Sequence, residues 1–184
     1  MKEQIKDYIM TDTDGVGVYC GTYRKYNEGN LYGAWIDLEK FADADEFFDV
    51  CRELHSDEED PEFMFQDYQG FPDDFYGESM SVGEVQAIIN WLALDDDERD
   101  MVEDYIEIYG GKLEQFDDVL DKARDKSMGR WRSFQDFADQ LADEEIGCYN
   151  VPDFFKTYFD YETFARDLRY DFSEGSNGYI FRDN

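Results

Sequence analysis

VGVYCGTY (Val16–Tyr23) and LYGAWIDL (Leu31–Leu38) are the two stretches from which the fold can be derived. Both are rich in β-branched and aromatic residues, which favour extended strands. Between them lies KYNEGN (25–30), in which asparagine and glycine can supply the positive φ that a hairpin loop requires. We therefore expect a β-hairpin near the start of the chain.

The residues that follow the hairpin indicate a helix and a third strand. Asp43 can cap a helix over Ala44–Leu54, with Glu46 at the third position as in a capping box. The inner face of this helix would hold Phe47, Phe48, Cys51 and Leu54. A strand over about residues 62–68 would complete a small mixed α+β unit.

The middle of the chain has the periodicity of helices. Ser81 and Glu84 form a second capping box. The buried stripe that follows it would be Val82, Val85, Ile88, Ile89 and Leu92. We expect two more helices, over Asp96–Tyr109, ending at Gly110-Gly111, and over about Leu113–Lys126.

The last third returns to a mixture of helices and strands. Ser133 and Asp136 begin a helix, and Pro152 suits the first turn of another. The apolar residues of the first of these helices are Phe134, Phe137, Ala138 and Leu141. Residues 160–168 are expected to be helical, and residues 169–172 and 178–182 to form strands.

The sequence therefore predicts an α+β fold that is elongated and built from three small consecutive units. The expected divisions are a flexible, frayed N-terminal extension (1–16), a first α+β domain (17–76), a helical domain (77–125) and a second α+β domain (126–184). A small core in each unit suits a chain with many charged surface residues.

The charge of the chain is far from that of an ordinary domain. Asp and Glu number 47 against 17 Lys and Arg, which gives a net charge of −30. Such a charge repels nucleic acid and anionic membranes and favours basic partners. The 16 Phe, 14 Tyr and 3 Trp, with only 3 Pro, exclude a disordered acidic tail. The chain is therefore expected to fold beneath a strongly acidic surface.

The cysteines and the apolar runs favour a cytoplasmic protein. Cys20, Cys51 and Cys148 are odd in number and widely spaced, so we expect reduced thiols in the core. Residues 1–10 have no apolar core of a secretory signal. The longest nearly apolar run, Ala87–Leu94, is too short to span a bilayer.

Candidate catalytic and metal-binding residues are few. His55 is the only histidine and is interpreted as a helix-terminal cation, so no nucleophile–histidine pattern can be built. Asp12-Thr13-Asp14-Gly15 resembles part of an EF-hand loop but fails at both ends, with Met10 and Gly21 at ligand positions. Close pairs of carboxylates arise by chance among 47 acids. We expect no catalytic residue, no metal site and no cofactor.

The acidic residues of the two central helices are the most informative candidates. On a helical wheel of about 100° per residue, those of the first helix lie within an arc of about 120°. They are Asp96, Asp97, Asp100, Glu103, Asp104 and Glu107. Those of the second helix are Glu114, Asp117, Asp118, Asp121 and Asp125.

The spacing of these carboxylates resembles that of a DNA strand. Six charges over about 16 Å of helix are roughly 3 Å apart, against about 3.4 Å between phosphates. Amphipathic helices with solvated faces are the ordinary explanation, but such faces normally mix Lys and Arg with the acids. The pattern therefore favours a phosphate-like surface. The only basic cluster, Lys126, Arg130 and Arg132, does not predict nucleic-acid binding.

Three segments resemble the ArdA family of antirestriction proteins. They are YCGTYRKYNEG (19–29) with GAWIDL (33–38), CRELH (51–55) with PEFMFQDYQGFP (61–72), and VPDFFKTYFDYETFARDL (151–168). The last resembles the antirestriction motif region, with Val151, Pro152, Tyr158, Phe159, Asp160, Tyr161, Glu162, Arg166, Asp167 and Leu168. The resemblance is close at both ends and loose in the middle third.

The resemblance implies a dimeric, non-enzymatic DNA mimic carried on conjugative plasmids or transposons. Its expected partner is the methyltransferase core of a type I restriction-modification enzyme in the cytoplasm of a bacterial host, with no nucleic acid and no membrane bound. We expect the homodimer to form through the third unit. An acidic adaptor or inhibitor of another basic DNA-binding protein, a calcium buffer and a concealed enzyme remain as alternatives.

Overall fold

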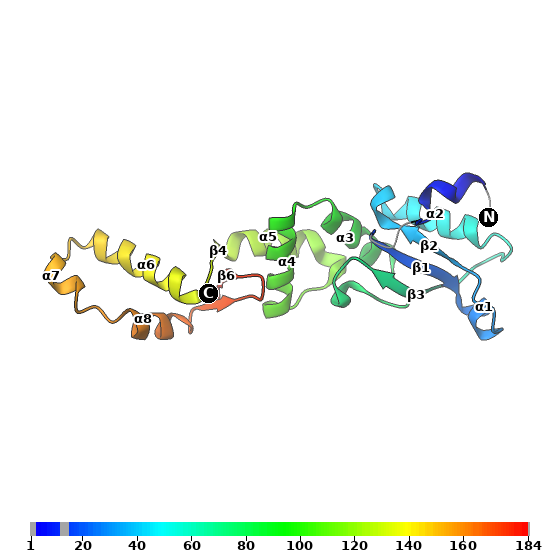
Figure 1. Cartoon of the computed structure of the whole chain (residues 1–184). Helices are drawn as coiled ribbons and strands as arrows, with labels where there is room; N and C mark the ends of the chain where they lie inside the picture. The colour runs from blue at the N-terminus through cyan, green and yellow to red at the C-terminus, as the bar shows by residue number, and fades with distance from the viewer. Residues whose placement is uncertain (1–2, 12–14, 184) are drawn as a thin grey trace. The chain divides into compact units, whose positions relative to one another are not determined.

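The computed structural model describes residues 3–11 and 15–183, which belong to two compact units (Figure 1). Unit 1 comprises residues 1–95 and 112–116, and unit 2 comprises residues 96–111 and 117–184. The predicted α+β class is confirmed, because the described residues form two three-stranded antiparallel sheets and eight α-helices in consecutive segments. The division into three domains stays a prediction.

The sheet of unit 1 has the order β2-β1-β3. Strand β1 (Gly17–Thr22) pairs antiparallel with β2 (Ala34–Asp37) and with β3 (Phe63–Gln69), with Val18 opposite both Ile36 and Tyr68. A bulge interrupts the β1–β3 register between Tyr19 and Cys20. The predicted hairpin and third strand are thus confirmed.

The hairpin connection is partly helical, contrary to the predicted loop. Helix α1 (Tyr23–Asn27) begins there because the Thr22 side chain accepts a hydrogen bond from the Lys25 backbone N–H. Gly29, at φ 75°, supplies the left-handed residue after this helix. A five-residue helix is too short to give a periodic signal in the sequence.

The N-terminal segment packs on the sheet instead of fraying. Residues Glu3–Tyr8 form a 3-10 helix, η1, in which Ile5 is buried. Ile9 forms an isolated bridge with Ile36, and the Met10 N–H donates to Trp35 O. The Tyr8 hydroxyl also donates to Glu46. Asp12–Asp14, in which the sequence resembles part of an EF-hand loop, lie outside the described residues.

Helices α2 and α3 complete unit 1. Helix α2 (Ala44–Leu54) is capped by Asp43, which accepts from the Glu46 N–H, and it buries its four predicted inner residues. Helix α3 (Val82–Leu92) has the predicted capping box of Ser81 and Glu84. Val82 is half-exposed, so it does not belong to the buried stripe. Short 3-10 helices η2 (Leu38–Lys40), η3 (Asp73–Phe75) and η4 (Leu113–Gln115) complete the connections.

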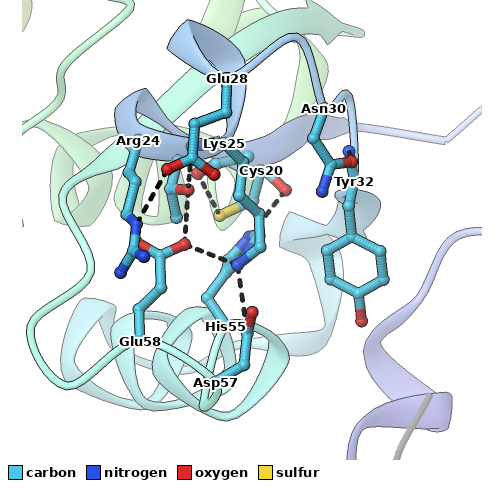
Figure 2. A network of polar contacts seen from close by, with 11 residues as sticks. Cys20, Arg24, Lys25, Glu28, Asn30, Tyr32, His55, Asp57 and Glu58 are labelled. Carbon is cyan, nitrogen blue, oxygen red and sulfur yellow. Dashed lines mark hydrogen bonds and ion pairs between the residues drawn. The ribbon is translucent and has the colours of Figure 1, made fainter.

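A buried ion-pair network joins α1 to the end of α2 (Figure 2). The Lys25 ammonium donates to Glu58 at 2.6 Å and to Asp57 at 2.9 Å, and Thr22 also donates to Glu58. Burial disfavours the charge on Lys25, but the hydrogen bonds to Glu58 and Asp57 outweigh it and raise its pKa. The network therefore holds a charged lysine inside unit 1.

Unit 2 is built on a second sheet, of order β4-β6-β5. Its strands are β4 (Ser127–Arg130), β5 (Phe172–Glu174) and β6 (Tyr179–Arg182). Strand β4 has no counterpart in the predicted elements, and β5 begins at the last residue of the expected strand 169–172. Gly178, at φ 90°, belongs to the β5–β6 turn.

The helices of unit 2 are α4 (Asp96–Tyr109), α5 (Phe116–Lys126), α6 (Phe134–Cys148), α7 (Asp153–Lys156) and α8 (Tyr161–Leu168). Ser133 caps α6 as predicted, and Pro152 lies one residue before α7. The core of α6, α8 and the sheet is formed by Phe134, Phe137, Ala138, Ala165, Phe172 and Ile180.

The three cysteines are free thiols, two of them buried and one exposed. Cys20 and Cys51 are free and buried as predicted, but Cys148 is exposed because it ends α6 on the outside of unit 2. Among the described residues, no helix is both long and apolar enough to cross a membrane.

We expect Lys25→Met to lower the free energy of unfolding by about 3 kcal/mol or more, because it leaves the buried Glu58 carboxylate without its cation. Urea unfolding followed by circular dichroism measures this change. Lys40→Met is the control, since Lys40 is 55% exposed and lies 3.8 Å from Asp37. Equal stability of the two variants would contradict the role of Lys25.

Candidate functional site

The acidic face of α4 is only partly the continuous surface that the helical wheel predicts. The side chains of Asp96 and Asp97 are 100% and 80% exposed, and Glu107 is exposed. Asp100 and Glu103 are half-buried. The acids in the first turn are favourable at a helix N-terminus. Met101, Val102 and Tyr105 are buried on the predicted inner side.

Asp104 is a correction to the predicted surface, because it is fully buried. Its Oδ1 accepts from the Asn177 N–H at 2.8 Å and from the Ser176 hydroxyl at 3.4 Å. Its Oδ2 accepts from the Tyr179 N–H at 3.0 Å. The carboxylate therefore caps the β5–β6 turn from inside unit 2 and cannot meet a partner.

The β5–β6 turn covers Asp104 because a glycine allows close approach. A Cβ added to Gly175 would lie 2.2 Å from Asp104 Cγ, so only glycine fits there. Burial raises the pKa of Asp104, and the hydrogen bonds from Asn177 and Tyr179 offset this only in part. A helical wheel of α4 could not show the contact between Asp104 and the β5–β6 turn, since the turn comes about 70 residues after α4.

We expect Asp104→Asn to destabilise the fold by about 1–3 kcal/mol, because an amide NH₂ would face one of the turn N–H donors. Asp97→Asn, at an 80% exposed side chain, is the matched control and should change stability by less than about 0.5 kcal/mol. Chemical unfolding of both variants measures the difference. A stable Asp104→Asn variant would show that the turn does not depend on this carboxylate.

Glu103 is the second perturbed acid of α4. Burial and then the negative charges of Asp100 and Asp104 raise the pKa of Glu103. Such a carboxyl has a higher pKa in the folded state than in the unfolded state. Its contribution to stability is fully present below the unfolded pKa, and this contribution is lost as pH rises through the folded pKa. The pKa values of Asp57 and Glu58 are lowered. The stability that these two carboxylates contribute is therefore lost as pH falls, in a more acidic range.

We therefore expect Glu103 to make the free energy of unfolding rise as pH falls toward the ordinary pKa of a glutamate, about 4.3, and Glu103→Gln to flatten this rise. Glu107→Gln, at an exposed position of the same helix, is the control. Urea unfolding at several pH values gives the slopes. Identical slopes for the wild type and Glu103→Gln would argue against a perturbed carboxyl at this position.

Three arginines partly neutralise α4. Arg130 Nη1 donates to Asp100 at 2.8 Å and lies 3.4 Å from Asp97. Arg124 of α5 binds Glu98 at 2.5 Å, and Arg99 lies 3.7 Å from Asp96. These contacts were missed by sequence reasoning, because two of the three arginines come from later elements of unit 2.

The acids of α5 form the more open face. Asp117, Asp118, Asp121 and Asp125 are exposed, opposite the buried Phe116, Val119, Leu120 and Ala123. Lys122 binds Asp118 at 2.6 Å. Within the described part of the chain, no ion pair holds Asp117, Asp121 or Asp125. The side chain of Glu114 lies outside what the structure describes.

The predicted antirestriction motif region comprises α7, α8 and the residues around them. Asp160 caps α8 by accepting from the Thr163 N–H, and the Tyr161 hydroxyl donates to Asp143 of α6. Leu168 packs against the core of unit 2. Tyr158, by contrast, is 73% exposed. The segment thus combines residues that dock on α6 with residues open to solvent.

The sole histidine is part of the Lys25 network (Figure 2). His55 follows α2 as expected, but it is fully buried, with Nδ1 3.3 Å from Lys25 Nζ and Nε2 3.2 Å from Cys20 O. An ammonium only donates, so Nδ1 accepts and Nε2–H donates to the carbonyl. The ring, interpreted from the sequence as a helix-terminal cation, is thus a buried hydrogen-bond partner of Lys25 and of the Cys20 carbonyl.

One group of side chains has the composition of a metal site. Ligand atoms of His55, Asp57 and Glu58 lie within 4.8 Å of one another. The Lys25 ammonium contacts all three at 2.6–3.3 Å and so occupies the position that an ion would take. The expectation of no metal site and no cofactor stays a prediction.

The fold and the surface together define a folded acidic protein whose most prominent feature is carboxylates on two neighbouring helices. The model of the ArdA family, described as antirestriction protein, matches residues 18–181, and the chain belongs to this family. Its members are non-enzymatic DNA mimics that inhibit type I restriction enzymes. No match was found among curated proteins.

Proposed function

We propose that this protein inhibits type I enzymes by placing the exposed acids of α4 and α5 in the groove where the methyltransferase core binds DNA. The observation that supports this most is the row of exposed carboxylates along α5, formed by Asp117, Asp118, Asp121 and Asp125. The Arg124–Glu98 salt bridge links α5 to α4 within unit 2. Asp104 has no part in this surface.

The physical basis is competition for the enzyme's cations. Arginines and lysines that normally bind phosphates would bind carboxylates fixed on a folded surface, with no duplex to deform. A net charge of −30 equals the phosphate charge of about 15 base pairs. The chain therefore has the charge for a long footprint. We place this event in the cytoplasm, where the enzyme acts.

We expect the contribution of each carboxylate to be small and their sum large. Asp121→Asn alone should weaken binding only a few-fold, since an exposed ion pair contributes about 0–1 kcal/mol. Joint neutralisation of the α4 acids should weaken it far more. The positions to change together are Asp96, Asp97, Asp100, Glu103 and Glu107. Titration against a purified methyltransferase core at several salt concentrations measures both.

A control with the same change in net charge separates position from total charge. It neutralises five exposed acids of unit 1, namely Asp45, Glu59, Asp60, Asp74 and Glu78. Equal weakening by the two sets would contradict the assignment to α4. A single Asp→Asn change that abolishes binding in a folded protein, or an affinity indifferent to salt, would contradict charge mimicry.

We also propose that two copies associate through the α6–α7 end of unit 2. Four exposed aromatics lie in this stretch: Tyr149, Phe154, Phe155 and Tyr158, each 61–78% exposed. Phe154 contacts both Phe155 and Tyr158, which makes a contiguous apolar patch. Residues 126–184 carry 12 acids against 7 bases, a net charge of −5, so two copies repel least there.

We expect joint replacement of Phe154, Phe155 and Tyr158 by serine to convert dimers to monomers, because the patch loses most of its apolar area. Sedimentation velocity over a range of concentrations measures the change. Tyr170→Ser is the control, since Tyr170 is 83% exposed but lies after α8. An unchanged dimer in the triple variant would place the contact elsewhere. A truncation at Asp125 is unsuitable because it would divide unit 2.

A further inference from the structure

Arg130 lies among the carboxylates of the α4 face, although it belongs to β4. Its Nη1 atom donates to both Asp100 and Asp97, at 2.8 and 3.4 Å. The Arg130 side chain is 48% exposed, and those of Asp97 and Asp100 are 80% and 32% exposed. The contact is therefore an open ion pair in which one nitrogen is shared between two acids, without the bidentate geometry of a strong arginine–carboxylate pair.

The backbone of unit 2 fixes Arg130 beside α4. Arg130 pairs with Tyr179 of β6, and the Tyr179 N–H donates to Asp104 of α4. The N–H of the next residue, Trp131, donates to the Gly178 carbonyl. The β5–β6 turn buries Asp104, and the strand that follows it, β6, pairs with β4. The same hairpin therefore positions Arg130 of β4 beside Asp97 and Asp100.

We infer that Arg130 is an internal counter-ion of the α4 face, which competes with the arginines and lysines of the target enzyme. This inference rests on the proposed function of that face. An enzyme cation that approaches Asp97 or Asp100 meets carboxylates already paired, so it replaces one ion pair by another and gains little. The protein consequently binds its target less tightly than its carboxylates allow.

The test compares Arg130→Gln with Arg132→Gln. Both variants lose one positive charge, but Arg132 is exposed and has no ion pair with α4 among the described residues. We expect Arg130→Gln to bind a purified type I methyltransferase core about two- to five-fold more tightly, the range of an exposed ion pair. The gain should come mainly from slower dissociation, whereas Arg132→Gln should alter the association rate alone.

A double-mutant cycle with Asp100→Asn locates the effect. In the wild type, Asp100→Asn should change affinity little, because Asp100 is already paired with Arg130. In the Arg130→Gln background, the same change should remove a large part of the gain. Arg130→Met, which keeps the aliphatic stem, serves as a second variant, and thermal melting verifies that every variant is folded.

Two outcomes overturn the inference in distinguishable ways. If neutralising the five α4 acids weakens binding but Arg130→Gln and Arg130→Met bind no more tightly than Arg132→Gln, Arg130 is not a competitor and the proposed function stands. If neutralising the α4 acids leaves binding unchanged, the proposed function of this face fails, and the inference fails with it.

Discussion

A buried carboxylate, that of Asp104, holds helix α4 against the β5–β6 turn. Two backbone N–H groups and a hydroxyl satisfy its oxygens, which offsets the cost of burying a charge. This contact, together with the buried Met101, Val102 and Tyr105, sets the rotation of the helix and so the direction of every other acid on α4. It also sets the place of β4, and through β4 the place of Arg130.

Residues of one chemical type therefore have three different roles in one helix. Asp96 and Glu107 are open to solvent, Asp97 and Asp100 share an arginine, and Asp104 is inside. A count of acids overstates the charge that a partner meets. The self-repulsion of a chain with net charge −30 is tolerated because two apolar cores and internal ion pairs such as Lys25–Glu58 oppose it.

The local elements could be predicted from the sequence because their signals are local. The caps Asp43, Ser81 and Ser133 lie next to the helices that they begin, and α4 has the predicted bounds. The contacts that decide which acids are exposed join residues 30 to 75 positions apart, such as Asp104 with Tyr179. No periodicity reports on such pairs. The elements α1 (YRKYN) and β4 (SMGR) were missed for another reason, since neither has the helical periodicity or the β-branched residues that mark a helix or a strand.

The three thiols differ in their exposure to solvent, and this difference allows the chain to be labelled at a single cysteine. Cys20 and Cys51 are buried inside unit 1, while Cys148 is exposed to solvent at the end of α6. A maleimide dye should therefore attach at one position of the native chain, without a cysteine having to be removed or introduced. That position adjoins Tyr149 and the aromatic patch of α7, so the fluorophore reports on whatever covers this end of unit 2.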